Sequence, residues 1–214
     1  MAQSLFDCSH PVEIEDEPRH HLVVANQFVR AFAVEIAPHD YTFCHHHPHD
    51  YLLYVTTDSE IISAARDEEP KRLNYQDGEC ELSSAGLTHV VENLGDAPFR
   101  NVVVELLPAA ETLRRGATPR PATGAARVDS ILDEPRGAIF SLTIDPHGEL
   151  EIAGPAVIAS PYGGVVMLKE VDDFDIPLDD FRKLIWVCAP RKVAVRNSGL
   201  AVARVCVFQI GVAG

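Results

Sequence analysis

The chain has 214 residues, of which 46% are hydrophobic and 23% are charged, an ordinary composition for a soluble globular protein with one large or two small domains. Its formal net charge of −14 argues against nucleic-acid binding, because contact with a phosphate backbone needs clustered Lys and Arg. The longest apolar stretch, residues 154–168, is broken by prolines and glycines, so we expect no membrane span and no membrane partner.

The N-terminal residues 1–21 are acidic and have neither the basic start nor the apolar segment of a secretory signal. We therefore expect an acidic arm over residues 1–21 of a cytoplasmic protein. The 5 cysteines are an odd number without clustered spacing, which predicts neither a disulfide framework nor a cysteine-based zinc site and suits a reducing compartment. They are Cys8, Cys44, Cys80, Cys188 and Cys206.

From Leu22 onward, short stretches rich in strand-forming residues alternate with turn residues. A spacing of about 8–12 residues between such stretches, without a long amphipathic helix, predicts an all-β fold of the sandwich or jelly-roll type. The strands expected in the first half are Phe28–Ile36, Cys44–Val55, Ile61–Arg66, Arg72–Tyr75, Glu79–Leu82, Val90–Asn93 and Arg100–Leu107.

The second half repeats the first after a change in composition. Residues 109–136 are rich in Pro, Ala, Gly and Arg, and we expect them to form a linker between domains over 22–108 and 137–214. Residues 193–210 align with residues 89–106, which places Asn197 on Asn93 and Val193 on His89. His45 and His47 fall near Ala153 and Pro155, so only the first copy retains its histidines.

The stretch Cys44–Val55, CHHHPHDYLLYV, carries the strongest chemical signal. Side chains alternate in a strand, so His45, His47, His49 and Tyr51 would share one face. Imidazoles two residues apart can converge on one ion, and neutral imidazole suits Zn, Cu, Fe and Ni. A histidine-rich surface edge is the alternative, but the run leads into the apolar LLYV, and unpaired buried imidazoles are costly.

For the other notable polar residues we expect structural positions at the surface, in the core or at a sheet edge. We expect His10, His20, His21 and His39 at the surface, and Cys44 in the core, facing away from the metal site. Arg30 and Glu105 interrupt apolar strands, and we expect both to reach solvent at an edge; the alternative is an inward position that needs a partner of opposite charge, which for Arg30 could be a substrate carboxylate.

Two motifs together resemble those of the cupin superfamily. The stretch GECELSSAGLTHVVEN is similar to the second cupin motif, with Ser84 in place of its proline, and Gly78, Gly86, His89 and Asn93 are the matching residues. His45 and His47 fill the H-x-H of the first motif, while Tyr51 stands where its glutamate is usual. The whole chain therefore resembles a bicupin.

The resemblance implies two tandem jelly-roll barrels, with one divalent metal held by His45, His47 and His89 in the N-terminal barrel only. A site without the usual glutamate carries less negative charge and should suit an anionic bidentate ligand. His49 could be a fourth ligand, a catalytic acid or base, or a residue packed at the rim. Tyr51 could donate a hydrogen bond to substrate or O2, or belong to the core.

Three functions stay open at this point. The first is a three-histidine Fe(II) dioxygenase acting on a small, metal-chelating substrate. The second is a Zn-, Mn- or Ni-dependent isomerase, decarboxylase or lyase, in which His49 or Tyr51 moves a proton. The third is a non-enzymatic cupin that binds a ligand or a structural metal. A homodimer is the assembly that the resemblance favours, although the fused second barrel could satisfy the same interface within one chain.

Overall fold

The computed structural model describes residues 8–162, 166–169 and 175–213. Regular structure in these residues is almost entirely β, together with the short 3-10 helices η1 (Ile14–Asp16) and η2 (Pro108–Thr112). Within the described ranges, no helix has the length and apolar character needed to cross a membrane. The prediction of an all-β fold is confirmed.

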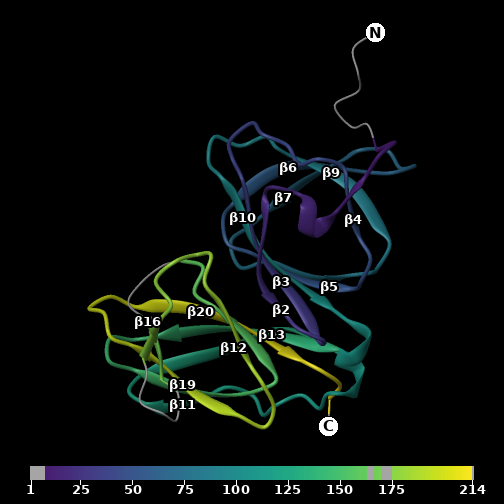
Figure 1. Cartoon of the computed structure of the whole chain (residues 1–214). Coiled ribbons are helices and arrows are strands. Elements are labelled where there is room, and N and C mark those ends of the chain that lie inside the picture. Colours follow the sequence, from purple (N-terminus) through teal and green to yellow (C-terminus); the bar gives the residue numbers. More distant parts are fainter. Residues whose placement is uncertain (1–7, 163–165, 170–174, 214) are drawn as a thin grey trace. The chain divides into compact units, whose positions relative to one another are not determined.

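The strands of the first half form two 5-stranded sheets, which face each other in Figure 1. One sheet has the order β1-β4-β9-β6-β7 and the other the order β2-β3-β10-β5-β8. Their bounds are β1 Val12–Glu13, β2 His20–Ala25, β3 Val29–Ile36, β4 His45–His47, β5 Tyr51–Val55, β6 Ser59–Ala65, β7 Lys71–Tyr75, β8 Cys80–Ser83, β9 Leu87–Asn93 and β10 Phe99–Leu106.

The second half forms two more 5-stranded sheets in the same order, β11-β14-β19-β16-β17 and β12-β13-β20-β15-β18. Each strand thus has a counterpart ten places earlier, which confirms the predicted tandem repeat of jelly-roll barrels. The bounds are β11 Arg120–Thr123, β12 Ala126–Glu134, β13 Gly137–Ile144, β14 Glu149–Ala153, β15 Ala156–Ala159, β16 Val166–Lys169, β17 Asp175–Pro177, β18 Leu184–Val187, β19 Lys192–Asn197 and β20 Ala203–Ile210.

The turn after β9 and the turn after β19 are built by equivalent asparagines. The Asn93 amide donates to the carbonyls of Ile36 and Ala97, and its Oδ1 accepts from the Gly95 N–H. Asn197 makes the same set of bonds, to the carbonyls of Ile144 and Ala201 and from the N–H of Gly199. Both side chains are buried, so each closes its turn from inside.

The chain forms two compact units, here called the N-terminal unit (residues 8–22 and 32–105) and the C-terminal unit (residues 23–31 and 106–213). The expected N-terminal arm is instead part of the first unit, because Val12 pairs with His45 and Ile14 is fully buried. The expected linker likewise contains β11 and β12, which pair with β14 and β13. The residues of β11 are all exposed, so its sequence lacks the apolar alternation that marks a strand.

A disulfide joins Cys8 to Cys44, 36 residues apart in sequence. Cys44 is buried, as expected, but its bond to Cys8 was not predicted, since nothing in the cysteine spacing pairs the two. The bond anchors the segment before β1 to the residue that precedes His45. Cys80, Cys188 and Cys206 are free thiols.

Candidate metal centre

The short strand β4 points two histidines into the N-terminal barrel. His45 and His47 are 0% and 2% exposed, while His46 faces the other way and its Nδ1 lies 2.9 Å from Thr88 Oγ1. Antiparallel pairing of β4 with β9 sets His45 directly opposite His89. The predicted alternation therefore holds over residues 45–47, and the sheet register brings the two cupin-like motifs together.

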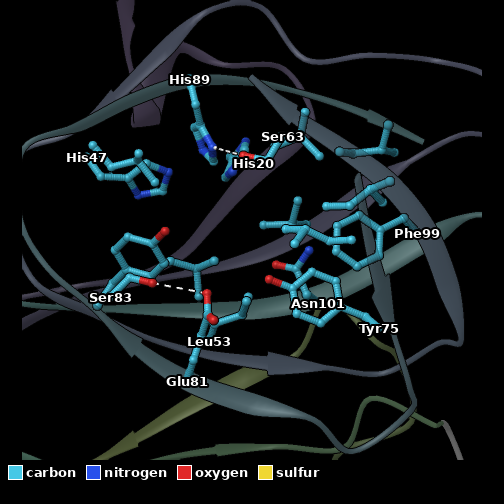
Figure 2. Close-up of a pocket in the computed structure, with 18 of the residues that line it drawn as sticks. His20, His47, Leu53, Ser63, Tyr75, Glu81, Ser83, His89, Phe99 and Asn101 are labelled. Atoms are coloured by element: carbon cyan, nitrogen blue, oxygen red, sulfur yellow. Dashed lines mark hydrogen bonds between the residues drawn. The ribbon is translucent and has the colours of Figure 1, made fainter. Parts of the chain in front are cut away.

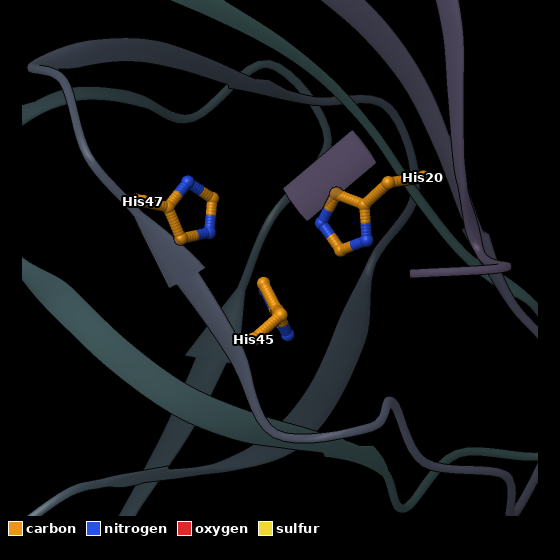
Figure 3. A group of neighbouring side chains, drawn as sticks. All are labelled: His20, His45 and His47. Carbon is orange, nitrogen blue, oxygen red and sulfur yellow. The ribbon is translucent and has the colours of Figure 1, made fainter. Parts of the chain in front are cut away.

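A third histidine joins them from β2. One ring nitrogen each of His20, His45 and His47 lies within 4.8 Å of the others, and Figure 3 shows the three rings around a common space. The expectation of a surface position for His20 is wrong, since this residue is only 8% exposed. Its neighbours in sequence are charged, but the start of β2 is covered by the barrel.

In His20 and His45, the ring nitrogen Nδ1 is hydrogen-bonded to an oxygen atom of the protein. His20 Nδ1 lies 2.8 Å from Glu17 Oε2, and His45 Nδ1 donates to the Phe43 carbonyl at 2.9 Å. With Nδ1 protonated, Nε2 keeps its lone pair for a metal. His45 Nε2 is buried and has no hydrogen-bond partner among the described residues, as expected for an atom reserved for an ion.

Glu17 is itself enclosed, with a side chain 0% exposed. Burial alone would raise its pKa, but the hydrogen bond and charge interaction with His20 lower it, helped by the backbone N–H groups of Arg19 and Phe43. The pKa is lowered overall, so Glu17 is a carboxylate at neutral pH and orients the His20 ring. No sequence motif identified Glu17 or His20 as part of a metal site.

His89 lies beside these rings, with its ring centre 4.6 Å from that of His45 and 5.3 Å from that of His47. Its Nδ1 is 3.1 Å from Ser63 Oγ. Burial lowers the pKa of His89 to about 3 and that of His45 well below its ordinary value, and the charge of His20 adds to both shifts. Both imidazoles are therefore neutral, the form that binds metals. The role of His89 as a ligand remains a prediction.

Tyr51 and Glu105 surround His47. The Tyr51 ring stacks on the His47 ring at 4.4 Å between centres, and Glu105 Oε1 lies 3.9 Å from His47 Nδ1. Burial raises the pKa of Tyr51 to about 12, so its hydroxyl stays protonated. Glu105 is fully buried, so the expectation of an edge position is wrong. Arg30 is half-buried on β3.

His49 occupies a different environment from the other histidines of its stretch. It lies in the bend between β4 and β5, is half-buried, and is not among the residues that line the cavity described next. The bend interrupts the alternation on which its inward direction was predicted. Its catalytic role therefore stays a prediction, whereas Tyr51 does line the cavity.

The histidines close one end of a cavity of about 230 Å³ inside the N-terminal unit. Its walls are mostly apolar, and Figure 2 shows further polar groups away from the histidines, those of Tyr75, Glu81 and Asn101, with Ser83 hydrogen-bonded to Glu81. The site thus combines buried, inward-facing imidazoles with room for a small molecule next to them.

Solved structures, one of them of a cupin barrel protein, share this fold. A vicilin from Solanum melongena has a TM-score of 0.62 at 12% identity, over 90% of this chain and 82% of its own. A cupin 2 conserved barrel domain protein from Leptotrichia buccalis has a TM-score of 0.53 at 9% identity, over 89% and 88%. A salicylate 1,2-dioxygenase from Pseudaminobacter salicylatoxidans has a TM-score of 0.57 at 10% identity, over 89% and 76%.

No protein-family model and no curated protein matches the chain. At these identities the structural likenesses establish the fold alone. They confirm the predicted resemblance to the cupins, and with the three convergent histidines they make this chain a two-barrel cupin fold with a candidate metal site in its first barrel.

Proposed function

We propose that this protein is a metal-dependent enzyme of the cupin type, in which Fe(II) supports the dioxygenation of a small substrate that chelates the metal. The observation that carries the proposal is the convergence of three buried imidazoles, with His45 Nε2 buried and lacking a hydrogen-bond partner among the described residues, at one end of a cavity. An apolar cavity with a few convergent polar groups is typical of a small-molecule site.

His20, His45 and His47 would hold the ion, with His89 in position to be a further ligand. Imidazole donors suit Fe, Zn, Ni and Cu. On an octahedral ion, three such donors leave three positions for other molecules and four leave two. On a tetrahedral zinc ion, four donors leave none. The number of bound histidines and the coordination geometry of the ion together therefore decide between a reactive and a structural metal.

A bound metal would supply Lewis acidity and a template that holds O2 beside the substrate. The chain's own groups do the rest. The Tyr51 hydroxyl is protonated and hydrogen-bonded to Ser83, and since the Ser83 proton goes to Glu81, Tyr51 can donate to a substrate oxygen only by giving up its bond to Ser83. The apolar side chains that line the cavity exclude water from the reacting groups. The salicylate dioxygenase among the structural neighbours supports the reaction class by analogy of fold only.

One observation favours a second candidate, a closed structural or ligand-binding site. His89 is as near to His45 as His20 is, with ring centres 4.6 Å apart in both pairs, and a fourth imidazole would complete a tetrahedral zinc ion. A Zn-, Mn- or Ni-dependent isomerase, decarboxylase or lyase would share the ligands and differ in consuming no O2.

The test combines metal analysis with oxygen uptake. Untagged protein purified without chelator would be analysed by mass spectrometry beside His45→Ala and, as a matched control, His39→Ala, which removes an exposed histidine bonded to Asp96. We expect one equivalent of iron in the wild type and the control, and none in His45→Ala. Iron-loaded protein should then consume O2 with at least one chelating substrate from a panel of salicylates, catechols, diketones and thiols.

Metal retained by His45→Ala would reject the site. One equivalent of zinc, with no oxygen uptake by the iron-loaded protein across the panel, would reject the dioxygenase and favour the closed site. Because metal content can reflect availability in the expression host, the uptake measurement carries the decision between these functions.

A further inference from the structure

Residues that pair across β8, β5 and β10 form rows in the cavity wall, and each successive row lies farther from the histidines. Ser83, Tyr51 and Glu105 form one row across β8, β5 and β10, next to His47. Glu81 belongs to the following row, opposite Leu53. At about 3.3 Å per residue along a strand, Glu81 lies about 7 Å from the Tyr51 row.

Asn101 stands opposite Val55 and marks a third row, about 13 Å from Tyr51 at the same rise per residue. It is 4% exposed and lines the cavity, yet its Oδ1 is buried without a hydrogen-bond partner in the described part of the chain. A buried acceptor left without a donor destabilises the protein, so its presence in a cavity wall points to a donor that a ligand supplies.

Away from the histidines, the charged side chains that line the cavity are negative. Of the described residues that line it, Glu81 alone carries a carboxylate and none is Lys or Arg. Glu81 accepts a hydrogen bond from Ser83 Oγ at 3.1 Å and another from Tyr75, which leaves further acceptor sites on its oxygens. Burial and, after it, the Glu81 charge raise the pKa of Tyr75, so a negative potential reaches into this end of the cavity.

Two aromatic rings complete the end remote from the histidines. Tyr75 and Phe99 stack in parallel with ring centres 6.0 Å apart, and both line the cavity near Asn101 (Figure 2). A carboxylate, an amide oxygen and aromatic faces around an apolar space form a recognition set for an organic cation, and they repel an anion.

We propose that the substrate carries an ammonium group at the end remote from its metal-chelating group, bound by the Glu81 carboxylate and Asn101 Oδ1. The assignment of the chelating end rests on the proposed function, whereas the ammonium end rests only on the residues of the remote wall. The substrate class is therefore an aliphatic or aromatic amine with a chelating head group, long enough to span about two rows of the sheet.

Three hydroxamates that differ only at the tail test this assignment on the metal-loaded protein. They are ε-aminocaprohydroxamic acid, heptanohydroxamic acid with a methyl group in place of the ammonium, and the monohydroxamate of pimelic acid with a carboxylate there. By isothermal titration calorimetry we expect the ammonium probe to bind about tenfold tighter than the methyl probe, because a hydrogen bond to a charged group is stronger than average, and the carboxylate probe to bind weakest.

Variants assign the preference to residues. Glu81→Gln keeps the shape of the side chain and should abolish the advantage of the ammonium probe without weakening the methyl probe. Asn101→Leu should reduce the same advantage, and it removes a buried atom that has no partner, so the protein should fold at least as well. Glu79→Gln, an exposed residue directly before β8, is the matched control and should leave the order of the three probes unchanged.

Equal binding of the three tails, or an ammonium preference that survives both Glu81→Gln and Asn101→Leu, would overturn the proposal. Failure of the metal site has a different signature, because then no hydroxamate would gain affinity on metal loading. Hexylamine, hexanol and hexanoate titrated into metal-free protein examine the remote wall alone. The same order of affinities, amine first and carboxylate last, would support it there, and the reverse order would overturn it.

Discussion

The two barrels pair their strands in the same order but differ at the positions that face inward. In the first barrel His45 stands opposite His89, and in the second Ile152 stands opposite Val193. Both aliphatic residues are buried in the apolar core of the C-terminal unit. The same backbone pairing therefore forms whether the interior of the barrel holds a histidine cluster or a packed apolar core.

A second equivalent pair shows the same contrast in charge. Glu105 aligns with Gln209 in the repeat, and both are buried. The Gln209 amide donates to the Ala117 carbonyl at 2.6 Å, a neutral bond that satisfies it within its own unit. The Glu105 carboxylate instead lies 3.9 Å from His47. Of this pair, only the residue of the first barrel can carry a charge, and it lies beside a histidine cluster, which is the arrangement expected of a metal site.

The largest expected effect comes from truncating one residue of each equivalent pair. His45→Ala should reduce metal binding from about one equivalent to none, because loss of a ligand exceeds the 10–100-fold loss typical of an outer partner. Ile152→Ala should leave metal content unchanged and lower the free energy of unfolding by about 2–5 kcal/mol through the cavity it creates. Metal analysis and chemical denaturation measure both.

The comparison fails if the two variants behave alike. Metal lost from Ile152→Ala while that protein stays folded would mean that the second barrel takes part in the site. A His45→Ala protein that is destabilised as strongly as Ile152→Ala in the absence of metal would make His45 a packing residue first.

Chelation should have the next largest effect. An ion present at about a thousandfold its dissociation constant stabilises the protein that binds it by about 4 kcal/mol. For a chain of this length, removal of the ion by a chelator should therefore lower Tm by about 10 °C. Calorimetry with and without chelator measures the difference. In His45→Ala the two scans should coincide, and a shift that persists there would locate the stabilising ion elsewhere.

The first barrel was largely predictable because its signals are local. Turn residues and alternating apolar residues marked most strands, and His45, His47 and Asn93 sit in short motifs whose spacing reflects strand periodicity. The register that sets His45 opposite His89 follows from pairing those motifs. The Asn197 turn was found for the same reason, since it repeats a local pattern.

The remaining features depend on contacts that no local pattern announces. His20 lies among charged residues, and only closure of the barrel buries it. The disulfide joins Cys8 and Cys44, which are 36 residues apart in sequence. The direction of the Glu105 side chain depends on which face of β10 is enclosed. The sequence does contain one weak indication of the His20 site. Glu17 and His20 are three residues apart, a spacing that lets a carboxylate reach an imidazole.

Glu17 therefore offers the finest test of how the first barrel differs from the second. Glu17→Gln removes the charge that holds the His20 ring while keeping most of the shape of the side chain, so metal affinity should fall about 10–100-fold and not vanish. Competition with a chromogenic chelator measures it, beside Asp16→Asn, an exposed change at the last residue of η1, directly before Glu17. Unchanged affinity would remove His20 from the ligand set and leave His45, His47 and His89, the set that the two cupin-like motifs predict.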